Sequence, residues 1–160
     1  MGAMIANGEM AASFRGTTEE DVQFFHGHTY SGNPLAAAVG MAVIDELVEK
    51  QLPEKARVMG EYLVERLQES HKYGIIREIR GKGLMRGVEF VQDTNTMEPF
   101  PVGRKLGDAM KKTAIKNGLI LRVQADFMSI APPLIVEKDD IDELVDLLDK
   151  SLSEALVQVS

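Results

Sequence analysis

Residues 75–91, IIREIRGKGLMRGVEFV, decide the fold because they combine two strand-like runs with a glycine-containing turn. The predicted strands are residues 75–80 and 84–91, and the tripeptide GKG joins them. Glycine adopts the positive φ angles that a tight connection requires, so the stretch predicts a β-hairpin. Its G-x-G sequence also looks like a phosphate cradle, but the dinucleotide-binding fingerprint lies between a strand and a helix. The pattern therefore favours a plain turn.

Helices are predicted on the N-terminal side of this hairpin. Residues 34–50 carry apolar side chains every four residues and follow Asn33, a residue type that caps helices. The first half of this helix is rich in alanine and includes Gly40, and such small side chains predict a deeply packed helix. A second amphipathic helix follows Pro53 and leads to the hairpin.

The C-terminal side repeats helix and strand signals. A helix ends at the Asn-Gly pair 117–118, and two short strands are predicted at residues 119–123 and 127–130. A last helix begins near Asp139 or Asp140, and Asp140 has a glutamate three residues later, which resembles a capping box. The whole order predicts the α/β class, more narrowly a two-layer α+β domain.

The composition is that of one globular domain. The chain has 160 residues, a mass of 17.6 kDa, 44% hydrophobic residues and a net charge of -7. This acidic balance argues against nucleic-acid binding, which needs a basic face. There is no cysteine, signal peptide or membrane-spanning apolar run, so we expect a cytoplasmic chain without a membrane partner. Six methionines are expected to fill the core: Met4, Met41, Met59, Met85, Met110 and Met128.

The most polar loop is residues 26–34, HGHTYSGNP, directly before the predicted helix. Its histidines His26 and His28 lie near Asp21 and are possible zinc ligands, but a zinc site needs a third and a fourth partner. Hydrogen bonding within the loop is therefore the favoured interpretation, and no metal is expected. Thr29 begins a triplet of hydroxyl residues that, together with backbone amides near a helix N-terminus, suits an anion such as phosphate.

Arg122 is the second candidate site residue. It ends the apolar run of residues 119–121, where a charged side chain needs either solvent or a partner. Two interpretations stay open at this point. The guanidinium reaches solvent beyond the strand end, or it binds a carboxylate through a charge-assisted contact.

Three strings of this sequence resemble, in order and spacing, the C-terminal part of class III pyridoxal-phosphate-dependent aminotransferases. They are residues 28–36 (HTYSGNPLA), residues 80–89 (RGKGLMRGVE) and residues 131–135 (APPLI). The resemblance covers nearly the whole chain. It implies the small C-terminal domain of a fold-type I transferase, together with a leftover edge of the large cofactor domain.

The resemblance also implies a domain division and a cofactor. Residues 1–33 match a remnant of the large cofactor-binding domain with its phosphate-contacting loop, residues 34–52 a connecting helix, and residues 53–160 the small domain. In the family, the threonine matched by Thr29 and the backbone of the residue matched by His28 hydrogen-bond the cofactor's phosphate. That pyridoxal 5'-phosphate is bound by the other subunit of a homodimer, so the resemblance implies this assembly too.

The position of arginine suggests a substrate class within this resemblance. In the ornithine, acetylornithine and 4-aminobutyrate branches, the carboxylate-binding arginine stands where this chain has Ser129. In the branch that uses amines or ω-amino acids with pyruvate, and in the diaminopelargonate branch, an arginine follows the Gly-Leu-Ile run, as Arg122 does. The resemblance therefore implies an amine or ω-amino acid to pyruvate transaminase, with Arg122 on the carboxylate of the acceptor. The other two groups of branches remain alternatives.

The family's Schiff-base lysine and its pyridine-binding aspartate correspond to positions before Met1. Lys55 and Lys82 do not match the catalytic position, so we expect the 160-residue chain to be inactive alone. A different hypothesis is a free-standing binding or regulatory module with the same fold. A polar surface on the helix of residues 34–50 favours that module, and an exposed apolar patch there favours a piece of an aminotransferase.

Overall fold

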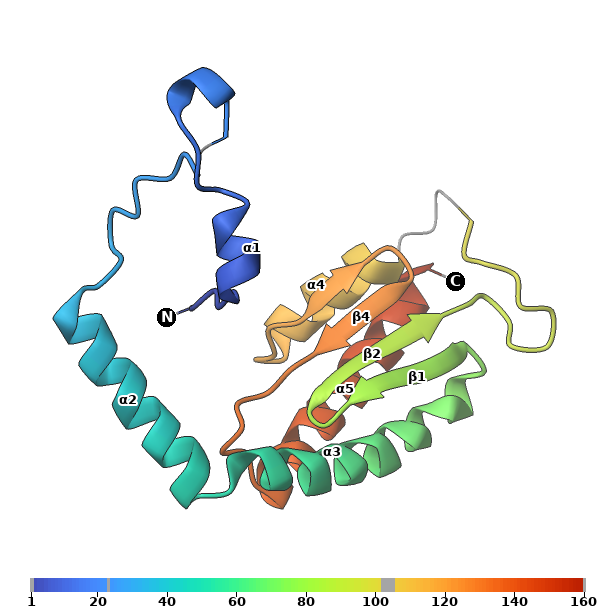
Figure 1. The fold of residues 1–160 in the computed structure, drawn as a ribbon. Helices are drawn as coiled ribbons and strands as arrows, with labels where there is room; N and C mark the ends of the chain where they lie inside the picture. The colour runs from blue at the N-terminus through green and yellow to red at the C-terminus, as the bar shows by residue number, and fades with distance from the viewer. Residues whose placement is uncertain (1, 23, 102–105, 160) are drawn as a thin grey trace. The chain divides into compact units, whose positions relative to one another are not determined.

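The computed structural model of the chain describes residues 2–22, 24–101 and 106–159 (Figure 1). The chain divides into two compact units, Met1–Glu49 and Lys50–Ser160. The first unit carries the polar loop, and the second carries the hairpin and Arg122. Within the described ranges, no helix is long and apolar enough to cross a membrane.

The described part of the first unit contains short helical elements followed by one long helix. These are α1 (Gly8–Ala12), the 3-10 helix η1 (Thr18–Glu20) and α2 (Pro34–Glu49). The Asn33 side-chain oxygen Oδ1 accepts the backbone N–H of Ala36 at 3.1 Å, which confirms the predicted cap of α2. The helix ends one residue earlier than the sequence predicted.

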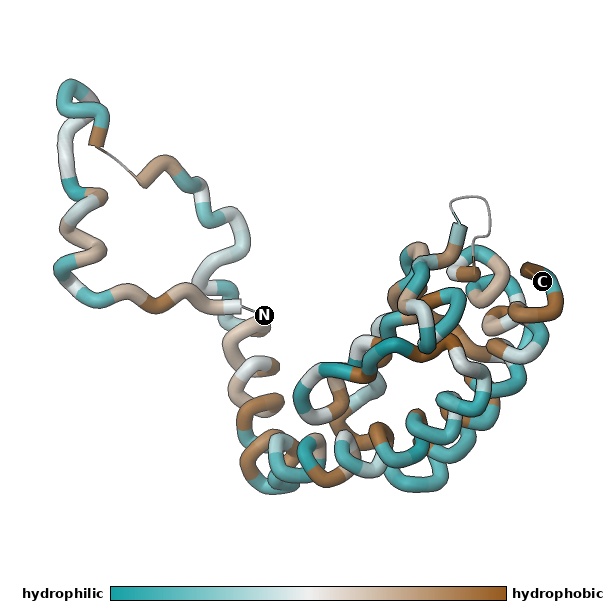
Figure 2. The backbone as a smooth tube through the Cα atoms, turned by 90° about the vertical axis from the view of Figure 1, so that its right-hand side faces the viewer, coloured by the Kyte–Doolittle hydropathy of each residue, from teal (hydrophilic) through white to brown (hydrophobic). Residues whose placement is uncertain are grey.

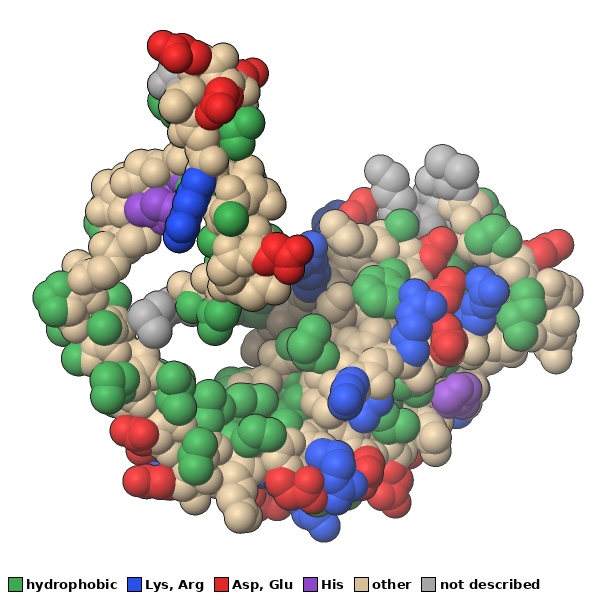
Figure 3. All heavy atoms as spheres, viewed as in Figure 1, with side chains coloured by type: hydrophobic (Ala, Val, Ile, Leu, Met, Phe, Trp, Pro, Cys, Tyr) green, Lys and Arg blue, Asp and Glu red, His purple; other side chains and the backbone are tan. Residues whose placement is uncertain are grey.

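The expectation that α2 is deeply packed is wrong. Gly40 is its buried residue and Leu47 is half-buried, whereas its other large apolar side chains are exposed. The exposed set comprises Leu35, Val39, Met41, Val43, Ile44 and Val48. Figure 2 shows this helix as an apolar stretch of the tube, and Figure 3 shows hydrophobic side chains gathered along it. Small and apolar residues indicate that a helix has a packing surface, but they do not specify what covers that surface.

The second unit is a sheet covered by helices, which confirms the predicted α/β two-layer class (Figure 1). Four antiparallel strands lie in the order β1-β2-β4-β3. The strands are β1 (Ile76–Lys82), β2 (Met85–Phe90), β3 (Arg122–Gln124) and β4 (Phe127–Ile130). The helices are α3 (Leu52–Gln68), η2 (Glu69–Tyr73), α4 (Leu106–Lys116) and α5 (Lys138–Val159).

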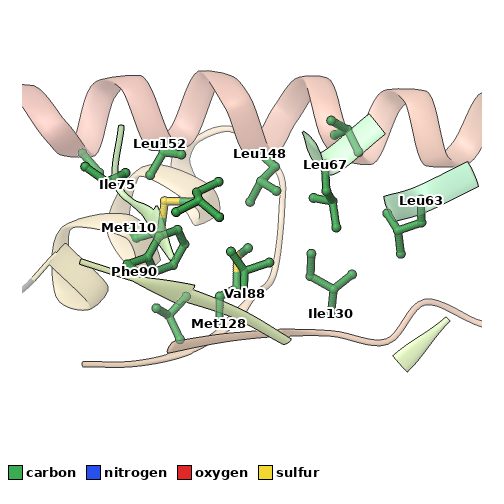
Figure 4. Close-up of a cluster of buried hydrophobic side chains, with 14 of the residues drawn as sticks. Leu63, Leu67, Ile75, Val88, Phe90, Met110, Met128, Ile130, Leu148 and Leu152 are labelled. Carbon is green, nitrogen blue, oxygen red and sulfur yellow. The ribbon is translucent and has the colours of Figure 1, made fainter. Parts of the chain in front are cut away.

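The hydrophobic core lies between the sheet and these helices. One row of paired residues, Val88, Met128 and Val123, faces inward, and each is 1% exposed. Figure 4 shows side chains from α3, α4 and α5 packing against this face, among them Leu63 and Leu148. Because side chains alternate along a strand, the neighbouring rows of β3 and β4 point to the opposite, outer face.

The predicted hairpin of residues 75–91 is confirmed as β1 and β2, with Lys82 paired to Met85. Gly83 in the turn has a φ of 54°, the left-handed conformation that glycine adopts without strain. The turn packs closely on α3, because a Cβ added to Gly60 would lie 2.0 Å from the carbonyl oxygen of Gly83. Gly60 therefore lets the helix and the turn meet backbone to backbone.

Several details differ from the predictions. The strand expected at residues 119–123 begins only at Arg122, after α4 and its Asn-Gly end. The last helix begins at Lys138, and Asp140 stands inside its first turn, where its carboxylate accepts the backbone N–H of Glu137 at 2.9 Å. Three of the six methionines expected in the core are instead exposed: Met4, Met41 and Met85.

Candidate functional site

The predicted anion loop is held in shape by its own two histidines. His28 has a φ of 46°, and its backbone N–H donates a 2.9 Å hydrogen bond to Nδ1 of His26. The His28 ring nitrogen Nδ1 lies 3.1 Å from Oγ of Ser31, whose N–H donates to the His28 carbonyl at 2.9 Å. Both histidines are thus used as local hydrogen-bonding groups, as the favoured interpretation of this loop expected.

Aromatic contacts complete the support of the loop. The His26 and His28 rings are 4.2 Å apart between centroids, and the Phe24 ring lies 5.9 Å and 5.6 Å from them. Phe14, two residues after the end of α1, meets Phe24 edge to face at 5.6 Å. Within the part of the chain that the structure describes, no group of three or more metal-binding side chains is close enough to hold a metal ion.

Thr29 and Tyr30 are the hydroxyl residues of the triplet that this arrangement leaves without a partner among the described residues, and Thr29 is the one that directly follows His28. It is exposed in the turn after His28, and among the described residues its hydroxyl and its N–H have no hydrogen-bond partner. The first turn of α2 offers few further N–H donors to an anion. Pro34 has no N–H, and the N–H of Ala36 already donates to the Asn33 side chain. The residues of this loop line an open concave surface that includes Thr29 and the start of α2.

This donor set fits a phosphate group. A hydroxyl and unpaired backbone N–H groups are the donors that bind phosphate oxygens in turns before helices. The His28 N–H, by contrast, is already bonded to His26, so it would donate to a phosphate only after that bond breaks. The role of His26 as this acceptor was not predicted, because neither composition nor spacing reports which side chain an amide meets.

Arg122 is the first residue of β3, on the outer face of the sheet, and it is exposed. Its cross-strand partner in β4 is Ser129, which in turn pairs with Gly87 of β2. Among the described residues, Arg122 has neither an ion-pair nor a hydrogen-bond partner. In the adjoining β3–β4 turn, burial raises the pKa of the Asp126 carboxyl.

The sequence-predicted site residues fall into two places. His28 and Thr29 adjoin each other in the first unit, whereas Arg122 lies in the second. Each place offers hydrogen-bond donors to an anion, one through a hydroxyl and amides and the other through a guanidinium. The chemistry common to both is recognition of small anionic groups.

Comparison with known proteins defines the class. The family model described as "Aminotransferase class-III" matches residues 1–152. The chain is 33% identical over 154 residues to an adenosylmethionine-8-amino-7-oxononanoate aminotransferase of Aquifex aeolicus, covering 96% of this chain and 34% of the relative. It is 37% identical over 138 residues to a putrescine–pyruvate aminotransferase of Pseudomonas aeruginosa, covering 86% of this chain and 30% of the relative.

A solved structure agrees with these relatives. The fold matches an (S)-enantioselective omega-transaminase from Thermomicrobium roseum with a TM-score of 0.80 and 36% identity, over 93% of this chain and 33% of that one. The chain belongs to the class III aminotransferase family, as the sequence resemblance implied. It spans about a third of the length of the relatives that it matches.

Proposed function

We propose that the chain is the C-terminal part of a pyridoxal-phosphate-dependent aminotransferase that moves an amino group from an amine or ω-amino acid to a keto acid such as pyruvate. Family membership supports the reaction class, and the names of the Pseudomonas and Thermomicrobium relatives support the substrate class. The single observation that carries the acceptor is the exposed guanidinium of Arg122, which has no partner among the residues that the structure describes. The planar guanidinium of an arginine binds a carboxylate through two parallel hydrogen bonds.

In this proposal, Thr29 holds the cofactor's phosphate. Its hydroxyl and N–H, which have no partner among the described residues, donate to phosphate oxygens, and the loop around His28 fixes their direction. The bound cofactor supplies the electron sink that amino-group transfer needs. We further propose a homodimer in which Thr29 of one subunit reaches the cofactor of the other, and a cytoplasmic location.

The exposed apolar side chains of α2 support a part of a larger aminotransferase over a self-sufficient module. Six large apolar residues on one helix of 16 residues exceed what a soluble free-standing surface usually presents in one place. The hypothesis of a free-standing binding or regulatory module expects this helix to be polar.

The first test asks whether the 160-residue polypeptide has a cofactor lysine of its own. The chain is incubated with pyridoxal phosphate, reduced with borohydride, and analysed by intact and peptide mass. We expect no stoichiometric adduct at a single lysine, because Lys55 and Lys82 do not match the family's catalytic position. One defined adduct would refute the proposal that this chain alone is inactive.

The second test supplies the rest of an aminotransferase. Residues 2–159 replace the matching third of the Thermomicrobium omega-transaminase, and amino transfer from an amine to pyruvate is measured. We expect Arg122→Ala to raise KM for pyruvate about tenfold or more with little change for the amine, because one charged hydrogen-bonding group is lost. Arg122→Lys keeps the positive charge but loses the paired N–H donors of the guanidinium. Its KM for pyruvate should lie between those of the parent and Arg122→Ala. An unchanged KM in Arg122→Ala would remove Arg122 from the site.

The same chimera tests the phosphate contact. Thr29→Val removes the hydroxyl at nearly constant volume, and Thr29→Ser keeps it. We expect the valine variant to bind pyridoxal phosphate more weakly by equilibrium dialysis, while the serine variant stays close to the parent. Equal affinities in all three proteins would contradict the proposed role of Thr29.

The second candidate function is that of the diaminopelargonate branch. The name of the Aquifex relative gives adenosylmethionine and 8-amino-7-oxononanoate as the two reactants, and the match covers 96% of this chain. Both branches place an arginine at the position of Arg122, so this residue does not separate the two candidates. The names of the relatives differ in the amino donor and in the keto acceptor. Turnover with adenosylmethionine and not with simple amines, in the protein completed by its own N-terminal part, would favour this second candidate.

A further inference from the structure

Arg122 is unusual among the arginines of its unit. In the described residues from 50 to 159, the other arginines all have hydrogen-bond or ion-pair partners: Arg57, Arg66, Arg77, Arg80 and Arg86. The chain also has 25 acidic residues for 18 basic ones, so carboxylates are plentiful. A guanidinium left unpaired in such a chain is available for an anion from outside.

Ser129 is the nearest polar neighbour that the sheet register gives to this guanidinium. Residues directly opposite in an antiparallel pair have Cβ atoms about 5 Å apart and side chains on the same face. The pairing of Arg122 with Ser129 meets this condition, and the inward row beside it contains Val123 and Met128. Ser129 is half-buried, and its hydroxyl has no hydrogen-bond partner among the residues that the structure describes.

The other arginine of the same row is occupied. Arg80 of β1 pairs with Gly87, and its guanidinium lies 5.5 Å from the centre of the Phe127 ring. It also makes an ion pair with Glu78 at 3.0 Å. Phe127 lies over Gly87, where an added Cβ would come within 2.6 Å of its ring. The ring thus stands between Arg80 and the open pair formed by Arg122 and Ser129.

We propose that the Ser129 hydroxyl is a second donor to the small carboxylate that Arg122 binds. This role rests on the proposed function, because it adds a residue to the acceptor site assigned to Arg122. The guanidinium supplies the charge and two N–H donors, and the hydroxyl donates to the side of the carboxylate nearer the sheet. Ser129 is therefore a substrate-binding residue that fixes the orientation of the carboxylate.

The experiment titrates sodium pyruvate into the 160-residue chain at constant ionic strength and follows the backbone amide NMR signals of β3 and β4. Pyruvamide, the neutral analogue, separates a response to charge from a response to the keto group. Four variants are compared with the parent: Arg122→Ala, Ser129→Ala, Ser129→Thr and the control Ser13→Ala. Ser13 is an exposed serine of the first unit with only a 3.4 Å contact from its hydroxyl.

We expect pyruvate, and not pyruvamide, to shift these signals, and Arg122→Ala to abolish the shift. Ser129→Ala should weaken the apparent Kd about tenfold, the loss expected for one hydrogen bond to a charged group. Ser129→Thr should restore most of the affinity, and Ser13→Ala should match the parent. Parental affinity in Ser129→Ala, with binding lost in Arg122→Ala, would overturn this inference and leave the role of Arg122 intact. Parental affinity in Arg122→Ala, or no response to pyruvate at all, would overturn both.

Discussion

The close contact between α3 and the hairpin turn gives a sharp test of the fold, the substitution Gly60→Ala. In an exposed helix this change stabilises by about 1 kcal/mol, because alanine has the higher helix propensity. Here the new Cβ would meet the Gly83 oxygen at 2.0 Å, whereas ordinary contact begins at 3.4 Å. The obstacle is backbone, so the helix and the hairpin must separate. Arg86, which donates to the Gly60 carbonyl at 3.2 Å, would lose that hydrogen bond.

We expect overpacking to cost about 3 kcal/mol, so that Gly60→Ala is destabilising by about 2 kcal/mol after the gain in propensity. The assay is urea unfolding of the 160-residue chain followed by far-UV circular dichroism. With a slope of about 1.5 kcal/mol/M, the midpoint should fall by more than 1 M. Glu65→Ala, an exposed position of the same helix, is the control and should stay within about 0.5 kcal/mol of the parent. A Gly60→Ala variant as stable as the parent would refute the backbone contact.

Two further outcomes follow from the packing of α4 on α5. Thr113→Val should lower the free energy of unfolding by about 1 to 2 kcal/mol, because the buried Thr113 hydroxyl donates to the Ser151 carbonyl at 2.8 Å. Thr113→Ser keeps this donor and should lower the free energy of unfolding by less. The hydrogen bond from Lys116, 3.0 Å from the Glu154 carboxylate, lowers the pKa of that carboxyl. This stabilisation is present above the ordinary glutamate pKa of about 4.3 and is lost as the pH falls through the lowered value. Urea midpoints of Lys116→Met should therefore decline less steeply in acid than those of the parent, and parallel declines would contradict the effect.

The sequence predicts the second unit well because its signals are local. The hairpin follows from glycines at a turn, and the helix of residues 106–116 follows from apolar spacing and an Asn-Gly end. The wrong predictions concern segments whose local sequence is compatible with two different structures. Residues 119–121 are apolar enough for a strand, yet no described residue pairs with them in the sheet, so β3 starts only where Arg122 meets Ser129.

The first unit shows a different limit of sequence reasoning. The spacing of apolar residues along α2 correctly predicts a helix, but burial depends on a covering surface that no pattern within the helix specifies. Met41 illustrates this, since it has the residue type of a core position and is nevertheless exposed. The same limit applies to the loop, where Thr29 was predicted as an anion ligand but the bond that occupies the His28 amide was not.

The two candidate anion sites therefore differ in what makes them binding sites. At Thr29, the loop already uses several of its other groups: His28 bonds to His26 and Ser31, and Asn33 caps the helix. Among the described residues, the Thr29 hydroxyl and amide have no partner, so they can donate to an external phosphate. At Arg122, the candidate site depends on the strand register. Pairing with Ser129 places a guanidinium and a hydroxyl side by side on the face of the sheet opposite the core. A sequence can indicate a residue with the right chemistry in each case. Whether that residue is free depends on what its neighbours already bind, which is a property of the fold.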